Sequence, residues 1–128
     1  NNFFPNRLET LDMSNNMFNG TLPNNYGSLS KLSICNLGHN KNLRGKLPSE
    51  YGSLYNLNVL GLSSCQLTGI IPSELGNLET ISILDLGNNM FKGNMPMEVC
   101  KLKVTGFLQE LLVNCDVNCT CCPNDCDA

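Results

Sequence analysis

The chain has 128 residues, a formal net charge of −3 and an apolar fraction of 41%. This composition is enough for one folded domain with a continuous core. Its one basic cluster, Lys41, Arg44 and Lys46, fits a solvated loop better than a nucleic-acid patch. No apolar run approaches the ~18 residues that a membrane span needs. We therefore expect no nucleic-acid partner and no membrane span in this chain.

The first segment is apolar. Phe3, Phe4 and Leu8 all lie within the first eight residues, which is less than one repeat of the chain. Exposed apolar surface of this kind marks an interaction site or an uncovered edge. We expect protein to cover this end, either an amino-terminal cap of the same protein or another subunit.

A unit of 24 or 25 residues then repeats along the chain, and the chain enters the first unit part-way. The clearest column is an apolar residue followed by proline, at Leu22–Pro23, Leu47–Pro48, Ile71–Pro72 and Met95–Pro96. The units read L-x-x-L-x-x-L-x-L-x-x-N-x-L-x-G-x-I-P-x-x-L-G-x, with one extra residue in the second near Lys41. The x-L-x-L-x part alternates with period two and predicts a short strand with one buried face. The part after proline predicts a short 3₁₀ or helical turn that returns to the core.

A polar column follows each predicted strand. Its members are Asn16, Asn40, Cys65, Asn89 and, after about three inserted residues, Asp116. The chain turns there and leaves backbone groups inside, and an asparagine amide can both donate to and accept from them. We expect a structural ladder at these positions, with the three asparagines buried.

The other face of the predicted strands carries small side chains and one β-branched ridge. The ridge consists of Ile34, Val59 and Ile83. It lacks the aromatic or arginine anchors that usually centre an interface. A solvated sheet with the binding site elsewhere is slightly favoured over a smooth groove for an extended peptide or a flat partner.

These columns resemble the plant-type leucine-rich repeats of receptor-kinase ectodomains, polygalacturonase inhibitors and many secreted algal proteins. The resemblance covers residues 8 to about 102 and rests on the G-x-I-P block. It implies an α/β repeat fold, a right-handed solenoid with a parallel sheet on one side, an extra sheet from the G-x-I-P region and short helical returns. We expect repeats over residues 1–102, about four with the first incomplete, and a final strand and cap over residues 103–128.

The cap is rich in cysteine. Its members are Cys100, Cys115, Cys119, Cys121, Cys122 and Cys126, and the run resembles the closing segment of secreted diatom leucine-rich-repeat proteins. We expect disulfides that cover the open end of the stack. Spacing does not choose among the pairings. A zinc cluster is the less favoured alternative, since no histidine is near. Cys35 and Cys65, in two other columns, are expected to be buried free thiols.

The cysteines and two sequons, at Asn19 and Asn118, predict an oxidising compartment: a secreted or lumenal protein with a possible N-linked glycan. No catalytic constellation, cofactor motif or metal motif is found, and the lone His39 fits a surface residue. We therefore expect a non-enzymatic recognition module, either secreted or part of a receptor ectodomain, with a protein partner. A structural subunit of a larger assembly is the alternative, and a carbohydrate- or ice-surface binder is a weaker one.

Overall fold

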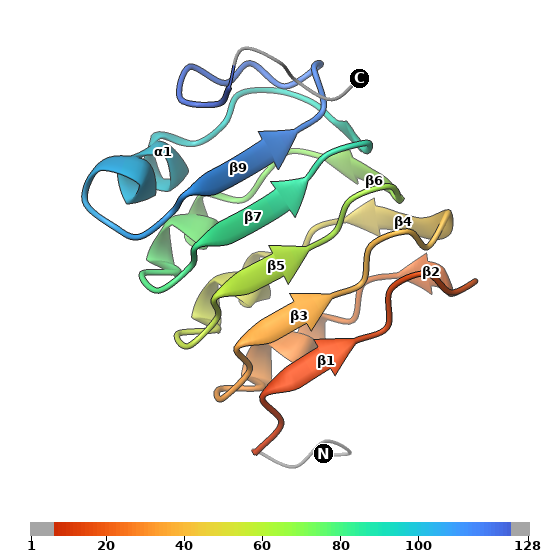
Figure 1. Cartoon of the computed structure of the whole chain (residues 1–128). Helices are drawn as coiled ribbons and strands as arrows, with labels where there is room; N and C mark the ends of the chain where they lie inside the picture. Colours follow the sequence, from red (N-terminus) through yellow and green to blue (C-terminus); the bar gives the residue numbers. More distant parts are fainter. Residues whose placement is uncertain (1–6, 124–128) are drawn as a thin grey trace.

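The computed structural model describes residues 7–123 as a stack of similar coils (Figure 1). Each full coil runs through a strand, a turn, a second short strand and a helical return before the next coil begins. Successive coils lie side by side, so that residues about 24 positions apart in the chain become neighbours.

The first strands of the coils form a parallel sheet of five strands in the order β1-β3-β5-β7-β9. These strands are β1 (Thr10–Asp12), β3 (Ile34–Asn36), β5 (Val59–Gly61), β7 (Ile83–Leu86) and β9 (Glu110–Val113). Leu84 pairs with Leu60 on one side and with Leu111 on the other. The register read from the leucine columns is therefore confirmed, including the longer step into the last coil.

A second parallel sheet of four strands has the order β2-β4-β6-β8. It contains β2 (Asn19–Thr21), β4 (Asn42–Lys46), β6 (Gln66–Gly69) and β8 (Met90–Phe91). It arises from the G-x-I-P region, as the family resemblance implies. Together with the first sheet and the helical returns, it confirms the solenoid fold class.

The return of each coil is a short helix that begins directly after proline. The 3₁₀ helices are η1 (Asn24–Ser28), η2 (Ser49–Ser53) and η3 (Ser73–Asn77), and the fourth return is an α-helix, α1 (Met97–Val104). Proline suits the position just before each helix because the ring fixes φ and the missing N–H is not needed there. Helix α1 runs past residue 102, and the division of the chain at that residue remains a prediction.

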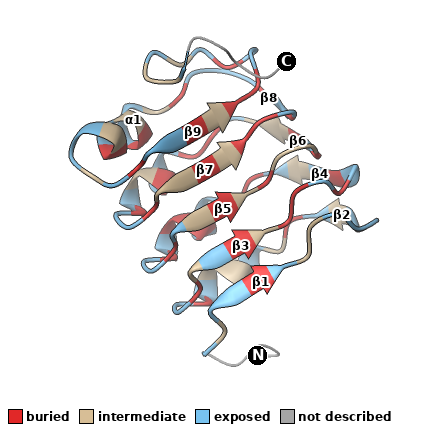
Figure 2. Ribbon diagram, viewed as in Figure 1, coloured by how far each residue is buried: buried red, intermediate tan, exposed pale blue. Residues whose placement is uncertain are grey.

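The core is a leucine column in the middle of each coil, enclosed by the two sheets and the returns (Figure 2). Leu60, Leu84 and Leu111 are fully buried. Tyr51 is fully buried in a column that holds Tyr26, Leu75 and Val99 in the other coils, and its hydroxyl donates to the Pro23 carbonyl oxygen at 2.9 Å. The phenol is thus satisfied by the preceding coil, and burial raises its pKa well above the ordinary value.

Close contact between successive returns depends on glycine. A Cβ at Gly27, Gly52 or Gly76 would overlap the backbone of Glu50, Glu74 or Glu98 in the next coil. In the fourth coil this column holds Cys100, in α1. Cys100 carries a side chain at this position, and α1 is the last return among residues 7–123.

Candidate interaction surfaces

The outer face of the five-stranded sheet is open to solvent and carries the ridge noted in the sequence. Ile34 is 37% exposed, while Val59 and Ile83 are half-buried. The register places these side chains next to one another across β3, β5 and β7. The result is a continuous apolar line across three coils, followed by exposed Glu110 on β9.

A column of mainly polar residues runs beside this ridge, and three of its side chains accept hydrogen bonds from the backbone. The side-chain oxygens of Asp12, Asn36 and Asp85 each accept the N–H of the residue two positions later, at 3.1 to 3.2 Å. The Ser14 hydroxyl also donates to Asp12 at 2.7 Å, and these bonds lower the pKa of the Asp12 carboxyl. The column therefore shapes the exit from β1, β3 and β7, while Gly61 and Leu112 occupy it in β5 and β9.

The ladder asparagines of the inner coils hold adjacent coils together. Asn40 is fully buried, and its amide nitrogen donates to the carbonyl oxygens of Met13, Leu37 and Gly38 at 3.1, 2.8 and 3.3 Å. Its amide oxygen accepts the N–H of Phe18 at 3.2 Å. Asn89 makes the matching four contacts two coils later. The ladder therefore supports the strand face and takes no part in a binding surface.

Asn16 does not follow this pattern, and the expectation that it is buried is wrong. It is exposed, and its amide donates only to carbonyl oxygens of its own coil, those of Met13 and Ser14. No coil precedes β1 among residues 7–123, so the bonds that the inner asparagines make to a preceding coil have no counterpart here.

Cys65 replaces the donor function of the ladder asparagine but not its acceptor function. It is buried, and its thiol reaches the carbonyl oxygens of Leu37 and Ser63 at 3.6 Å. It has no amide oxygen for the Leu43 N–H of the preceding coil, which instead donates to the Asn40 carbonyl oxygen at 3.0 Å. The extra residue near Lys41 lies in that preceding coil, so the inserted residue and the changed ladder residue fall in adjacent coils.

Asp116 is exposed, and its assignment to the ladder is wrong. Asn114 is buried instead: its amide oxygen accepts the Phe91 N–H at 3.2 Å and its nitrogen donates to the Phe91 carbonyl oxygen at 2.8 Å. By the spacing of the other coils, Asn114 would fall on the exposed face of β9. The chain turns directly after β9, where the Val117 N–H donates to the Asn114 carbonyl oxygen at 3.1 Å, so the ladder contact falls two residues early.

His39 lies in a column of left-handed residues that the sequence reading did not identify. Asn15, His39, Ser64 and Asn88 all have φ between 53° and 58°. Asparagine adopts this conformation more readily than most residues, and the two asparagines in the column were the available signal. His39 is exposed, in keeping with a surface position.

The amino-terminal end of the stack exposes apolar side chains. Met17 is 87% exposed and Phe18 43%. A hollow of about 200 Å³ beside Phe18 is lined mainly by apolar groups, including Tyr26 and Leu43. Leu8 is half-buried against the core, and Phe3 and Phe4 lie outside the described residues.

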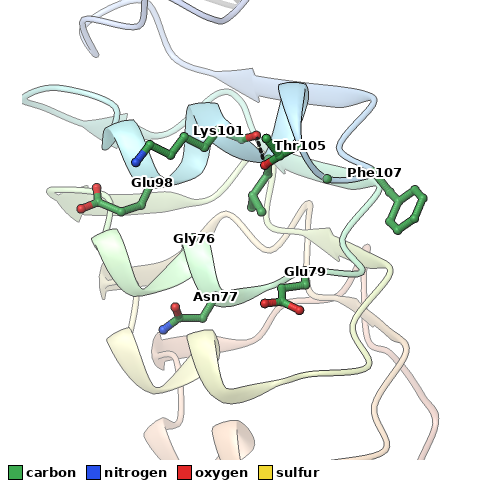
Figure 3. Close-up of a pocket in the computed structure, with 9 residues that line it drawn as sticks. Gly76, Asn77, Glu79, Glu98, Lys101, Thr105 and Phe107 are labelled. Atoms are coloured by element: carbon green, nitrogen blue, oxygen red, sulfur yellow. Dashed lines mark hydrogen bonds between the residues drawn. The ribbon is translucent and has the colours of Figure 1, made fainter.

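A second hollow, of about 410 Å³, lies between η3, α1 and the turn before β9 (Figure 3). Glu98 and Lys101 enter it from α1, and Asn77 and Glu79 from the η3 side. Phe107, 71% exposed, stands at its rim. The lining has mixed charge, and its charged side chains, Glu79, Glu98 and Lys101, are exposed.

The cysteine-rich tail is tied to α1. One disulfide joins Cys100 to Cys121 and a second joins Cys119 to Cys122. Cys115 is also disulfide-bonded, and Cys126 lies outside the described residues. Cys119 and Cys122 have the C-x-x-C spacing, a feature of the tail that the sequence reading overlooked.

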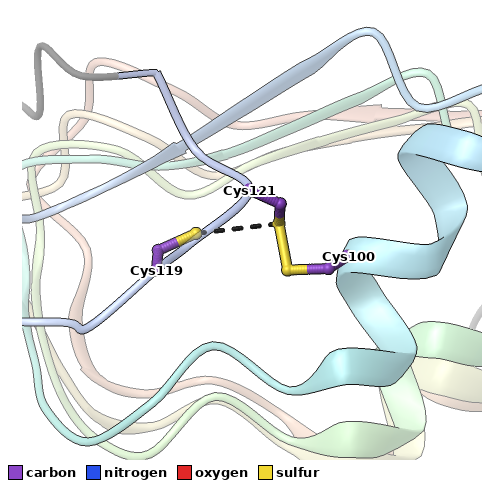
Figure 4. Close-up of side chains that lie close together, drawn as sticks. All are labelled: Cys100, Cys119 and Cys121. Carbon is purple, nitrogen blue, oxygen red and sulfur yellow. Dashed lines mark hydrogen bonds between the residues drawn. A yellow bond between two sulfur atoms is a disulfide. The ribbon is translucent and has the colours of Figure 1, made fainter.

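The two disulfides touch each other. The sulfur atoms of Cys119 and Cys121 lie 3.8 Å apart, along the dashed line of Figure 4. Both are in disulfides and carry no hydrogen, so this is a packing contact between sulfurs. Cys35 and Cys65 are free and buried, and burial raises the pKa of the Cys35 thiol to about 12.

The two sequon asparagines differ in their surroundings. Asn19 is exposed in the edge strand β2. Asn118 is also exposed, but its amide nitrogen donates to the Asn94 side chain at 3.1 Å and the next residue is held in a disulfide. Asn19 is the more accessible acceptor for a glycan. Among residues 7–123, no helix combines the length and apolarity needed to cross a bilayer.

Comparisons with known proteins agree with this architecture. The leucine rich repeat family model matches residues 7–29 and 56–78. A search of curated proteins found no match. Solved structures gave several.

The Arabidopsis thaliana receptor-kinase ectodomain GASSHO1/SCHENGEN3, solved with CASPARIAN STRIP INTEGRITY FACTOR 2, is 34% identical over 90% of this chain, with a TM-score of 0.80. The PEPR1–AtPEP1 structure is 38% identical over 88% of the chain, also with a TM-score of 0.80. The Arabidopsis thaliana receptor kinase SOBIR1 ectodomain is 31% identical over 81%, with a TM-score of 0.72. This chain spans 13%, 15% and 55% of those three chains.

Proposed function

Because the chain is a leucine-rich-repeat protein of the plant type, we propose that it is a non-enzymatic module that recognises a peptide or protein partner. The observation that carries the proposal is the outer face of the five-stranded sheet, an open parallel surface with an apolar ridge and a polar column beside it. Two similar structures were solved with CASPARIAN STRIP INTEGRITY FACTOR 2 and with AtPEP1.

The face suits an extended chain. The ridge of Ile34, Val59 and Ile83 can receive apolar side chains, and the adjoining oxygens of Asn36 and Asp85 can accept backbone N–H groups. Binding would cost little side-chain entropy, because the ridge residues are short and Val59 and Ile83 are already half-buried. A peptide lying across the strands would meet both columns at β3 and β7, while Gly61 leaves β5 without a side-chain oxygen between them.

The test is a displayed library of random peptides panned against the full chain. Val59→Asp places a charge in the middle of the ridge and should abolish binding of the selected peptides. Gln66→Asp is the matched control, since Gln66 is exposed on β6 in the other sheet. Peptides that bind both variants equally, or a library that yields no binders, would contradict the proposal.

A second candidate is a structural subunit, favoured by the apolar amino-terminal end. Met17 and Phe18 are exposed there beside an apolar hollow. If this end is the contact, Phe18→Asp should change the mass measured by size-exclusion chromatography with light scattering, while Val59→Asp should not. A chain that stays monomeric in every variant speaks against the assembly role.

The same proposal places the protein outside the cytoplasm. Disulfides form and persist in oxidising compartments, and the cap contains two whose partners are both described. A glycan at Asn19 would lie on the sheet opposite the ridge and leave the proposed peptide face free. The likeness of the tail to diatom proteins remains a prediction, as do a carbohydrate- or ice-binding role and the absence of a cofactor.

A further inference from the structure

The proposed recognition function does not use the sulfur cluster at the carboxyl end of the stack. The sulfur atoms of Cys100, Cys119 and Cys121 all lie within 4.8 Å of one another, and Cys122 joins them through its bond to Cys119 (Figure 4). Cys100 comes from α1 and the other cysteines from the tail. Thus two separate segments bring three sulfurs within 4.8 Å of one another, and a fourth is bonded to one of them.

The spacing of these sulfurs suits a tetrahedral metal ion. With metal–sulfur bonds of about 2.3 Å, a tetrahedral thiolate site places its sulfurs roughly 3.8 Å apart. The unbonded sulfurs of Cys119 and Cys121 are already 3.8 Å apart. Cys119 and Cys122 have the C-x-x-C spacing that is common among zinc ligands, while Cys100 approaches from the helix (Figure 4).

Contacts other than the disulfides hold the cluster together. The Met95 N–H donates to the Asn118 carbonyl oxygen at 2.9 Å, and the Asn118 N–H donates to the Gly93 carbonyl oxygen at 2.8 Å. Val117 is buried in the core. These contacts join the tail to the last coil independently of the disulfides.

The local charge favours thiolates. The Lys103 ammonium group donates to the Cys121 carbonyl oxygen at 3.0 Å, so a positive charge lies beside the cluster. A zinc ion with four thiolates carries a net negative charge, which this lysine offsets. All four cysteines are half-buried, so a small reductant can reach them and a bound ion would be partly shielded from water.

We propose that Cys100, Cys119, Cys121 and Cys122 form a binding site for a thiophilic divalent metal ion such as Zn²⁺ when a thiol reductant opens both disulfides. Each disulfide takes two electrons and two protons from the reductant and becomes two thiols, while two thiols of the reductant become a disulfide. Metal binding then releases the four cysteine protons. The oxidised cap is a covalent closure of the stack, and the reduced cap is a metal-held closure.

The experiment uses the full chain, reduced under anaerobic conditions and titrated with Co²⁺ alone. The expected result is a single equivalent of bound Co²⁺ with the visible absorption of a tetrahedral thiolate site, displaced by Zn²⁺. X-ray absorption of the zinc form should count four sulfur neighbours. The oxidised chain should bind none.

Variants separate this site from unspecific thiol binding. Cys121→Ser should lose the absorption, whereas Cys115→Ser and the double variant Cys35→Ala, Cys65→Ala should keep it. Retention in Cys121→Ser, or a sulfur count below four, would overturn the proposal. So would a reduced chain that binds no Co²⁺, whether it stays folded or has unfolded by circular dichroism. Failure of this test would not bear on the proposed peptide recognition, because Val59 and the rest of the ridge belong to other coils.

Discussion

At the residue scale, the ladder works because one amide serves two coils. In Asn40 and Asn89 the nitrogen gathers carbonyl oxygens from its own coil and the coil before, while the oxygen takes an N–H of the coil before. The cost of burying a polar group is offset only when all of these bonds form. Exposed Asn16, with two bonds inside its own coil, shows what remains without a preceding coil.

This difference gives a matched pair of substitutions. Asn40→Leu should lower the free energy of unfolding by about 3 kcal/mol or more, because it strands the Phe18 N–H and buried carbonyl oxygens at roughly 1–3 kcal/mol each. Asn16→Leu should change it by less than about 1 kcal/mol, since water can replace the bonds of an exposed amide. Urea unfolding followed by circular dichroism measures both. Equal effects at the two positions would mean that bonding between coils does not set the stability of the ladder.

At the scale of the element, the returns are positioned by contact with one another. Each 3₁₀ helix begins directly after a proline, and its glycine lets the next return come close enough for backbone contact. In α1 the same position holds Cys100, which is bonded to Cys121 of the tail. The position therefore contacts the next return in three coils and the tail in the fourth.

Gly52→Ala tests this packing. The added methyl group would overlap the Glu74 carbonyl group, so the free energy of unfolding should fall by about 2 kcal/mol or more. Ser53→Ala, at the exposed neighbour on the same 3₁₀ helix, should have little effect. Thermal unfolding of the two variants against the parent chain gives the comparison. A harmless Gly52→Ala would show that the returns can move apart freely.

At the scale of the whole molecule, stability adds up along the stack, since each coil contacts mainly its neighbours. The carboxyl end has β9 paired on one side only, with the disulfide-tied tail packed beyond it. Covalent closure is an economical way to cover an open end without a large core of its own.

Reduction should therefore act from one end. After treatment with a reductant, the backbone amides of β9 should exchange hydrogen faster, while those of β5 in the middle of the stack keep their protection. Cys35 and Cys65 are already free thiols, so among the described cysteines the reductant breaks only disulfides of the cap. Hydrogen exchange with mass spectrometry resolves the two regions. A uniform loss of protection would indicate that the cap stabilises the stack as a single unit.

The strand positions, the proline-started returns and the buried free thiols all follow from the sequence by itself. They could be predicted because each depends on a column repeated at a fixed step, and every coil packs its leucines in the same surroundings. Leu60, Leu84 and Leu111 align as their spacing requires. The ridge of Ile34, Val59 and Ile83 follows in the same way, because alternation along a strand fixes which side chains face outward.

Only the tertiary structure decided what happens where the repetition stops. Asn114 takes the ladder contact in place of Asp116 because the chain turns sooner after β9, which no column predicts. Asn16 is exposed because burial of a ladder residue is supplied by the preceding coil and not by the residue itself. The pairing of Cys100 with Cys121 and of Cys119 with Cys122 depends on how the tail folds across α1, since composition permits many pairings and only proximity selects one.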